Sequence, residues 1–285
     1  MNLPAEAVAA ASREWVWVPE TAVVVETPEY LLARMPDWFD VQLELLRLDP
    51  ERPVGDVVDE VIARARELGG PEVNCWAKLH NDPSVDAVLL ARGGVLDETL
   101  DVLALDLTDG LPDVGPWDQR IDLRWVTDAA TARDHHEVGM VVFGGDMAPD
   151  DELERAAADG RRQLPAGEGG AVVAYLDGVP VGAGGIAQPG DVARLWGGSV
   201  REEARGLGVY RALLDARLRY GRDHGATMAL VKGRIQTSGP ILRRAGFERY
   251  ERSSPYRSNP ARRRIGPEVW MRPFTRAIVA PWSRP

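Results

Sequence analysis

Short apolar runs alternate with one longer helical segment over the first hundred residues. Residues 22–27 and 41–48 are apolar or alternate polar with apolar side chains, and both predict strands. Residues 54–68 place apolar side chains three and four positions apart, which predicts a helix that Gly69 and Gly70 end. We expect a strand at 73–79, a short helix at 83–92 and a strand at 100–107 to follow.

The rest of the chain shows a fuller set of elements. The pattern predicts, in order, a strand at 121–126, helices at 129–142 and 150–164, strands at 171–176, 181–187 and 192–197, a helix at 209–224, a strand at 228–232 and a short helix at 238–245. This order is typical of an α/β fold with a mixed sheet. A helix, a strand, a short helix and a glycine occur over 54–94 and again over 209–247. The echo indicates either a partial duplication or two ordinary helix–strand–helix units.

A break rich in proline and glycine separates the two parts. Residues 111–120 read Leu-Pro-Asp-Val-Gly-Pro-Trp-Asp-Gln-Arg, which is typical of a linker. The sequence therefore predicts an N-terminal segment at 1–110, a linker at 111–120, and a second domain at 121–285 that ends in an arginine-rich tail.

The composition, with 45% hydrophobic and 27% charged residues, is that of an ordinary globular protein. No apolar run approaches the roughly 20 residues of a membrane helix, and the N-terminus does not resemble a secretion signal. The single cysteine, Cys75, excludes an internal disulfide and fits a reducing compartment. We expect a cytoplasmic protein without a membrane partner.

The net charge of −10 is unevenly distributed. The first 120 residues carry 9 basic and 24 acidic residues, whereas the rest carry 25 and 20. This acidity argues against nucleic acid as a partner of the whole molecule. The arginine-rich tail could bind phosphates or neutralise the acidic part, and we favour the second because its arginines lie among prolines without interleaved aromatic residues.

One connection carries the clearest chemical signal. After the strand at 192–197, the loop Arg205-Gly206-Leu207-Gly208 leads directly into an amphipathic helix. Glycines let consecutive N–H groups turn toward one point, and the helix adds unpaired amides and the positive end of its dipole. Arg205 and Arg211 supply positive charge, so the segment suits a pyrophosphate. A P-loop motif is missing, and Arg211 stands where a dinucleotide-binding motif needs its third glycine.

These residues resemble the GNAT superfamily of acyl-CoA N-acyltransferases. Its central motif, Gln/Arg-x-x-Gly-x-Gly/Ala before a long helix, is matched by residues 203–208 except at the first position. Its next motif, a short helix ending in Gly-Phe, is matched by residues 237–247. The resemblance covers about 121–250. It implies a GNAT fold with a mixed, mostly antiparallel sheet flanked by helices, and acetyl-CoA as co-substrate.

The resemblance also implies roles for individual residues. The coenzyme A pyrophosphate would be held by Arg205, Gly206, Leu207, Gly208, Val209, Tyr210 and Arg211. Gly198, Ser199 and Val200 would pair with the pantetheine arm and offer an N–H to the thioester carbonyl. Thr237 and Ser238 would lie near the thiol, and an ordinary helix N-cap is an equally good interpretation of both.

Several positions depart from the family pattern. Glu203 replaces the usual Gln or Arg, and the last short helix lacks the tyrosine that often protonates the departing thiolate. Ser238, Tyr250 or water could take that role. The strand before the loop has no glutamate to act as a base, only Asp191 at its edge, so the base stays unassigned.

Other candidate groups are weaker. Residues 134–137, Asp-His-His-Glu, point in different directions on a helix, and Cys75 is isolated, so we expect no metal site. One of the two histidines could contact substrate, although a solvated surface role is favoured. Trp196 could form a wall of the acceptor site or belong to the core.

The first half is similar to the last part of a GNAT fold, but it lacks the phosphate loop. Its equivalent residues, 50–56, contain two prolines and two acids, which oppose an anion. We therefore predict a smaller GNAT-like α/β segment that binds no coenzyme.

The chain as a whole is predicted to be an N-acetyltransferase that acts by direct attack on acetyl-CoA. The expected acceptor is a small, cationic primary amine. Two alternatives are a non-catalytic, acyl-CoA-binding regulatory module and an enzyme that uses another donor such as succinyl-CoA. A homodimer is left open.

Overall fold

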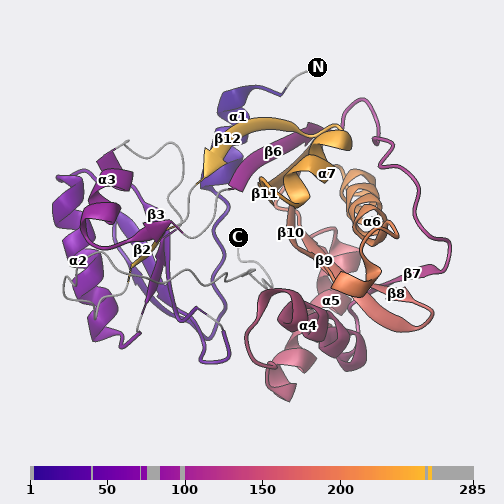
Figure 1. Cartoon of the computed structure of the whole chain (residues 1–285), viewed down its shortest axis with the longest axis horizontal. Helices are drawn as coiled ribbons and strands as arrows, with labels where there is room; N and C mark the ends of the chain where they lie inside the picture. The colour runs from indigo at the N-terminus through magenta and orange to yellow at the C-terminus, as the bar shows by residue number, and fades with distance from the viewer. Residues whose placement is uncertain are drawn as a thin grey trace. The chain divides into compact units, whose positions relative to one another are not determined.

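The computed structural model describes residues 3–39, 41–70, 72–75, 84–96, 100–253 and 256–258. Within them the chain divides into two compact units (Figure 1). One unit comprises residues 3–15 and 102–250, and the other comprises residues 16–101 and 251–258. The predicted boundaries at 110 and 121 do not coincide with this division. The expected arginine-rich tail lies outside the described residues.

The first unit is built on a seven-stranded mixed sheet. Its strand order is β12 (Glu248–Ser253), β6 (Leu100–Asp106), β11 (Met228–Arg234), β10 (Val192–Val200), β9 (Val179–Ala187), β8 (Gly169–Leu176) and β7 (Ile121–Trp125). Strands β7 to β10 pair antiparallel, whereas β10 and β11 pair parallel. This arrangement agrees with the predicted mixed, mostly antiparallel sheet.

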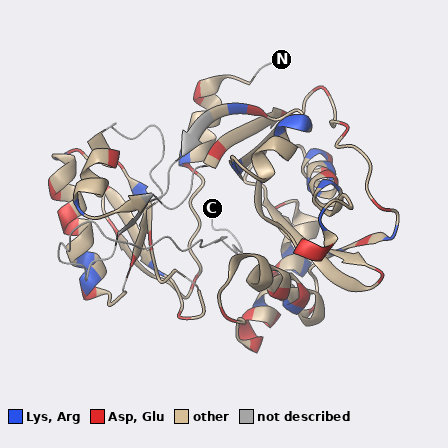
Figure 2. Cartoon of the chain, in the orientation of Figure 1, with Lys and Arg blue, Asp and Glu red and all other residues tan. Residues whose placement is uncertain are grey.

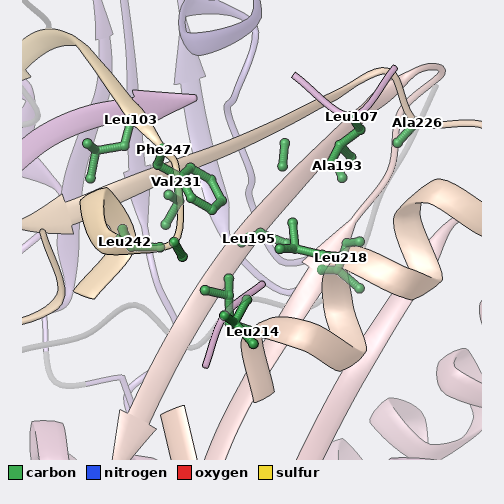
Figure 3. Packing of buried hydrophobic residues seen from close by; sticks show 14 residues of the cluster. Leu103, Leu107, Ala193, Leu195, Leu214, Leu218, Ala226, Val231, Leu242 and Phe247 are labelled. Atoms are coloured by element: carbon green, nitrogen blue, oxygen red, sulfur yellow. The ribbon is translucent and has the colours of Figure 1, made fainter. Parts of the chain in front are cut away.

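Helices cover both faces of this sheet. Consecutive side chains of a strand point to opposite faces. Leu195 of β10 packs against Leu214 and Leu218 of α6 (Val209–Asp223), as Figure 3 shows. The next side chain, Trp196, lies edge-on to His135 of α4 (Ala129–Phe143). Helix α4 therefore covers the face opposite α6, and it packs beside α5 (Asp150–Ala166).

The same apolar core extends along the sheet past β11 to β6. Leu103, Val231, Leu242 and Phe247 lie together there, around α7 (Ser238–Arg244) (Figure 3). Helix α1 (Ala5–Arg13), which the sequence pattern did not predict, packs beside the same sheet through Val8. No helix in the described ranges is long and apolar enough to cross a membrane.

The second unit contains a six-stranded sheet. Its order is β1 (Val23–Glu26), β2 (Tyr30–Arg34), β3 (Leu43–Leu48), β4 (Val73–Cys75), β13 (Tyr256–Ser258) and β5 (Val95–Leu96). Helices α2 (Val54–Glu67) and α3 (Ser84–Ala91) accompany it, and Leu32, Leu45 and Val57 belong to its core. The predicted strand at 73–79 is described only to Cys75.

The two sheets repeat one pattern of pairing. Strands β2 and β3 pair antiparallel and β3 and β4 pair parallel, just as β9, β10 and β11 do. A helix, α2 or α6, follows the middle strand of each set. The repeat predicted between 54–94 and 209–247 is therefore present in the topology.

Each sheet takes one strand from the other half of the chain. Strand β6 follows β5 in sequence but lies between β11 and β12, whereas β13 follows β12 but lies between β4 and β5. This exchange is why the chain does not divide at the predicted linker: residues before the linker complete the later sheet, and residues near the end complete the earlier one.

Candidate functional site

The connection from β10 to α6 forms the predicted glycine loop. The short turn η1 (Glu202–Ala204) leads to Gly206 and Gly208, whose φ angles are +85° and +86°. The first hydrogen bond of α6 runs from Ala212 N to Gly208 O at 3.0 Å. Within the described chain, no backbone amide from Gly206 to Arg211 donates a hydrogen bond. These amides lie at the positive end of a helix and are free to bind an anion.

The predicted linker forms a wall behind this loop. A Cβ atom on Gly208 would lie 2.6 Å from Trp117 Cβ, so only glycine fits there. Asp118 N donates a hydrogen bond to Leu207 O at 3.0 Å. By contrast, a Cβ atom on Gly206 would have no neighbouring atom within 4 Å. The loop is thus anchored at Gly208 and open at Gly206.

The charged side chains around the loop are mostly exposed. Arg205 is exposed and makes one long ion pair, 3.9 Å, with Glu202. Glu203, the residue that departs from the family motif, is also exposed on the acidic turn drawn in red ahead of α6 in Figure 2. Arg211 is half-buried, and its Nε has no hydrogen-bond partner in the described chain. Neither Arg205 nor Arg211 therefore makes a short ion pair with a residue that the structure describes.

Strand β10 changes its pairing just before the loop. Its parallel pairing with β11 ends at Leu195, although β10 continues to Val200 and β11 to Arg234. On the other edge, the register with β9 shifts between Trp196 and Ser199, where β10 has one extra residue. Gly197, with φ of +61°, lies in this bulge. The edge of β10 that faces β11 is consequently free from the bulge onward.

The free edge offers donors to an extended ligand. Arg201 N donates to Val181 O of β9 at 2.9 Å. Successive N–H groups along a strand point to alternate edges. The N–H of Val200, one residue before Arg201, therefore points toward the free edge, and so does the N–H of Gly198, two residues earlier. The structure thus brings the predicted residues 198–200 and 206–211 together on one strand–loop–helix connection.

Ser238 and Thr237 lie where β11 passes into α7. Ser238 Oγ accepts a hydrogen bond from Arg234 N at 2.9 Å, which leaves the hydroxyl proton available for donation. Thr237 precedes the helix without a side-chain cap bond.

Tyr250 is not brought to this site. It lies on β12 at the far edge of the sheet, and its hydroxyl donates to Leu3 O at 3.2 Å. The reason is topological: β6 enters between β11 and β12 and moves the strand after α7 outward by one position. The sequence could not indicate this displacement, because β6 comes from the other half of the chain.

The two histidines of α4 are buried, so the favoured surface role is wrong. His135 is 8% exposed and His136 is 7% exposed, because this side of α4 packs on the sheet. His136 Nε2 accepts a hydrogen bond from Ala148 N at 3.1 Å and holds the segment after α4. The Nε2 of His135 has no partner in the described chain, and burial lowers its pKa to about 4.

The neighbouring acids are engaged elsewhere. Asp134 accepts a hydrogen bond from Tyr175 Oη at 2.6 Å, and Glu137 pairs with Arg201 at 2.8 Å. In the ranges that the structure describes, no three His, Cys, Asp or Glu side chains lie close enough to hold a metal ion.

The loop of the second unit that corresponds to the glycine loop is filled by the protein itself. It follows β3 and precedes α2, and its amides at Glu51 and Arg52 donate to Glu29 Oε1 at 2.9 and 2.8 Å. Arg52 Nε donates to the other oxygen of Glu29 at 2.7 Å. These hydrogen bonds, that of the Arg52 side chain first, lower the pKa of Glu29. An internal carboxylate therefore takes the place of an anionic ligand.

Sequence reasoning missed two contributors to the first site. The sequence of residues 111–120 predicted only a connection. Its one large aromatic residue, Trp117, was the only indication that this segment packs against another part of the protein. Arg217 of α6 lies beneath the bulge of β10, bonded to Trp196 O. The sequence could have indicated Arg217, because it lies four residues after Leu213 on the apolar face of a helix, where a charged side chain is unusual.

A family comparison agrees with this site. Residues 140–236, about a third of the chain, match the model of the acetyltransferase (GNAT) family. The match includes β10, the glycine loop, α6 and β11. No curated protein sequence matches the chain.

Solved structures extend the likeness to both units. A GCN5-related N-acetyltransferase from Kribbella flavida is similar over 90% of this chain and 95% of its own, with 17% identity and a TM-score of 0.61. One from Sphaerobacter thermophilus is similar over 85% and 82%, with 20% identity and a TM-score of 0.61. A tandem GNAT protein from the clavulanic acid biosynthesis pathway is similar over 92% and 89%, with 17% identity and a TM-score of 0.55. The chain therefore has the GNAT fold, and its residues 140–236 match the GNAT acetyltransferase family model.

Proposed function

We propose that the chain is an N-acetyltransferase that moves the acetyl group of acetyl-CoA to a primary amine of a small cationic molecule. The observation that carries this proposal is the run of unpaired amides from Gly206 to Arg211, placed directly after the free edge of β10. The amides would grip the pyrophosphate, and the free edge would pair with the pantetheine arm.

The chemistry follows from where the donors lie. The N–H of Gly198 or Val200 would donate to the thioester carbonyl and stabilise the oxygen that becomes negative on attack. The nitrogen of a neutral amine forms the new C–N bond, and the C–S bond then breaks. The acceptor ammonium gives one proton to solvent before the attack. When the C–S bond breaks, the thiolate takes a proton from the Ser238 hydroxyl or from water, and that donor regains a proton from the positively charged nitrogen of the new C–N bond.

Transfer is proposed to be direct, without an acyl-enzyme. The one cysteine, Cys75, is buried, and burial raises the pKa of its thiol to about 12, so almost no thiolate forms near neutral pH. Cys75→Ala should leave the turnover rate unchanged. Complete loss of turnover in a folded Cys75→Ala protein would contradict direct attack.

A cationic acceptor is supported by charge. The first 120 residues carry 24 acidic against 9 basic residues, and such a field attracts cations at low salt. Thiol release from acetyl-CoA should therefore be faster with polyamines and amino sugars than with neutral or acidic amines across a panel. The preference should weaken as salt is raised.

The decisive experiment is calorimetry with coenzyme A. We expect one binding site per chain, because the corresponding amides of the second unit are taken by Glu29. Absence of binding would end the proposal. Binding without transfer to any amine would favour the regulatory module, a reading supported by the lack of any carboxylate on β10.

A further inference from the structure

Arg217 of α6 and Asp101 of β6 are the two most deeply buried charged residues of the described ranges. Arg217 is 1% exposed, and its guanidinium lies between the helix and the sheet. Nε donates to Leu213 O at 2.9 Å, and Nη1 donates to Gly185 O at 3.4 Å and to Trp196 O at 3.3 Å. One side chain thus connects α6, β9 and β10 at the bulge.

Among the described residues, no carboxylate pairs with this charge. The acceptors are backbone carbonyls, and Nη2 has no hydrogen-bond partner among the described residues. The hydroxyl of Tyr210 lies near the guanidinium. Glycine at position 184 leaves room for the guanidinium, because a Cβ atom there would lie 3.0 Å from Nη1. A buried cation without an anion is costly, and apolar residues of similar size often replace such groups without loss of stability.

The open nitrogen lies next to the amides that the proposed reaction needs. A Cβ atom on Gly198 would lie 3.6 Å from Arg217 Nη2, so the charge lies directly beneath the bulge. The bond from Nη1 to Trp196 O also holds the peptide group between Trp196 and Gly197, at the start of the bulge. The field of the guanidinium adds to the N–H dipoles at the free edge of β10.

We propose that Arg217 is a positioning residue for the thioester carbonyl. It fixes the bulge of β10 and places a positive charge behind its amides, so that they polarise the carbonyl of a bound acyl-CoA. This inference rests on the proposed function, since it assumes that acyl-CoA lies along β10. Arg217 itself would not touch the substrate.

The test uses the full chain and acetyl-CoA labelled with ¹³C at the carbonyl. Infrared difference spectra report the stretching frequency of the bound carbonyl, which falls as the carbonyl is polarised. In Arg217→Met we expect this shift to decrease by about half or more, with less than a roughly tenfold change in acetyl-CoA affinity, because removing one pre-organised charge weakens polarisation and leaves the phosphate amides in place. Arg217→Lys keeps the charge, so its carbonyl shift should lie between that of Arg217→Met and that of the unaltered protein.

The matched control is Arg219→Met. Arg219 lies on the same helix, is 61% exposed and pairs with Asp215, so its loss should leave the carbonyl frequency unchanged. The melting temperature separates positioning from a structural role. A residue that only positions the carbonyl can be replaced by methionine without lowering the melting temperature, whereas a structural clamp cannot.

Each outcome decides one question. If the unaltered protein does not bind acetyl-CoA, the proposed function fails, independently of Arg217. If Arg217→Met binds acetyl-CoA with an unchanged carbonyl frequency, the role of Arg217 is overturned. It is also overturned if both Arg217 variants unfold or melt far below the unaltered protein, since Arg217 is then a structural clamp.

Discussion

Gly206 and Gly190 share a backbone conformation but differ in what surrounds them. Both have positive φ, +85° and +64°, and neither would bring a Cβ atom within 4 Å of another atom. Gly206 lies in the glycine loop, whereas Gly190 lies in the turn between β9 and β10. Alanine in this conformation costs on the order of 1 kcal/mol at either position.

The first prediction compares these two glycines. Gly206→Ala should weaken coenzyme A binding about tenfold or more, since relief of the strain turns the loop amides away from a common point. Gly190→Ala should lose similar stability and keep its affinity. Calorimetry and thermal melts measure both quantities, and equal affinities of the two variants would contradict the phosphate role of the loop.

His135 makes stability depend on pH. Its folded pKa, about 4, lies below the ordinary value of 6.5, so between these values the unfolded chain binds a proton that the folded protein does not. The free energy of unfolding is therefore full above pH 6.5 and falls as the pH is lowered toward 4. At pH 5 the loss from this one residue is about 2 kcal/mol.

Replacing His135 should flatten that dependence. His135→Phe keeps a ring against Trp196 and removes the titrating group, although His136, whose pKa is also lowered by burial, retains part of the slope. Urea unfolding at pH 7.5 and 5 tests this, and parallel slopes in the His135→Phe and unaltered proteins would refute it.

At the scale of elements, local signals were sufficient for the connection between β10 and α6. Glycine spacing and the start of an amphipathic helix are adjacent in sequence, so Gly206 and Gly208 could be placed correctly. The burial of His135 and the partners of Arg217 could not, because Gly185 O and Trp196 O come from strands whose register no local pattern specifies. Local patterns therefore predicted the glycine loop but not the groups beneath the bulge.

The connection between β3 and α2 yields a prediction at the same scale. Glu29→Gln removes the charge that Glu51 N, Arg52 N and the Arg52 side chain share, so the melting temperature at pH 7 should fall. The pKa of Glu29 is lowered, so its stabilisation is present above its ordinary pKa and is lost as the pH falls below it.

Glu26→Gln is the matched control. Glu26 is 63% exposed and pairs with Arg47 at the surface, so its loss should hardly change the melting temperature. Coenzyme A should still bind once per chain in Glu29→Gln, because prolines at 50 and 53 supply no N–H groups. A second binding site in that variant would show that Glu29 blocks a competent loop.

At the scale of the whole molecule, the exchanged strands set the limit of sequence reasoning. Strand β13 has three residues, and nothing in its sequence identifies β4 and β5 as its neighbours. Proline and glycine at 111–120 indicated a boundary, but the same residues pack behind the glycine loop. Composition identified a connection correctly and could not show which sheet the strand before it would join.

The exchange predicts that the two halves cannot fold separately. A fragment of residues 1–110 lacks β13 and leaves β4 and β5 without their shared neighbour, and a fragment of residues 111–285 lacks β6 between β11 and β12. Each loses an inner strand, next to the edge of its sheet, so neither should show a cooperative melt by circular dichroism.

Mixing the two fragments tests whether each half needs the strand that the other half supplies. The mixture supplies both exchanged strands, so the complex should melt cooperatively and bind one coenzyme A. Either fragment alone, at the same total concentration, should do neither. Because the glycine loop, α6 and β11 all lie in 111–285, that fragment has every residue of the proposed phosphate site and lacks β6 and α1 from the sheet around it. If it folded alone and bound coenzyme A as tightly as the full chain, β6 would be dispensable and the two halves would be independent domains.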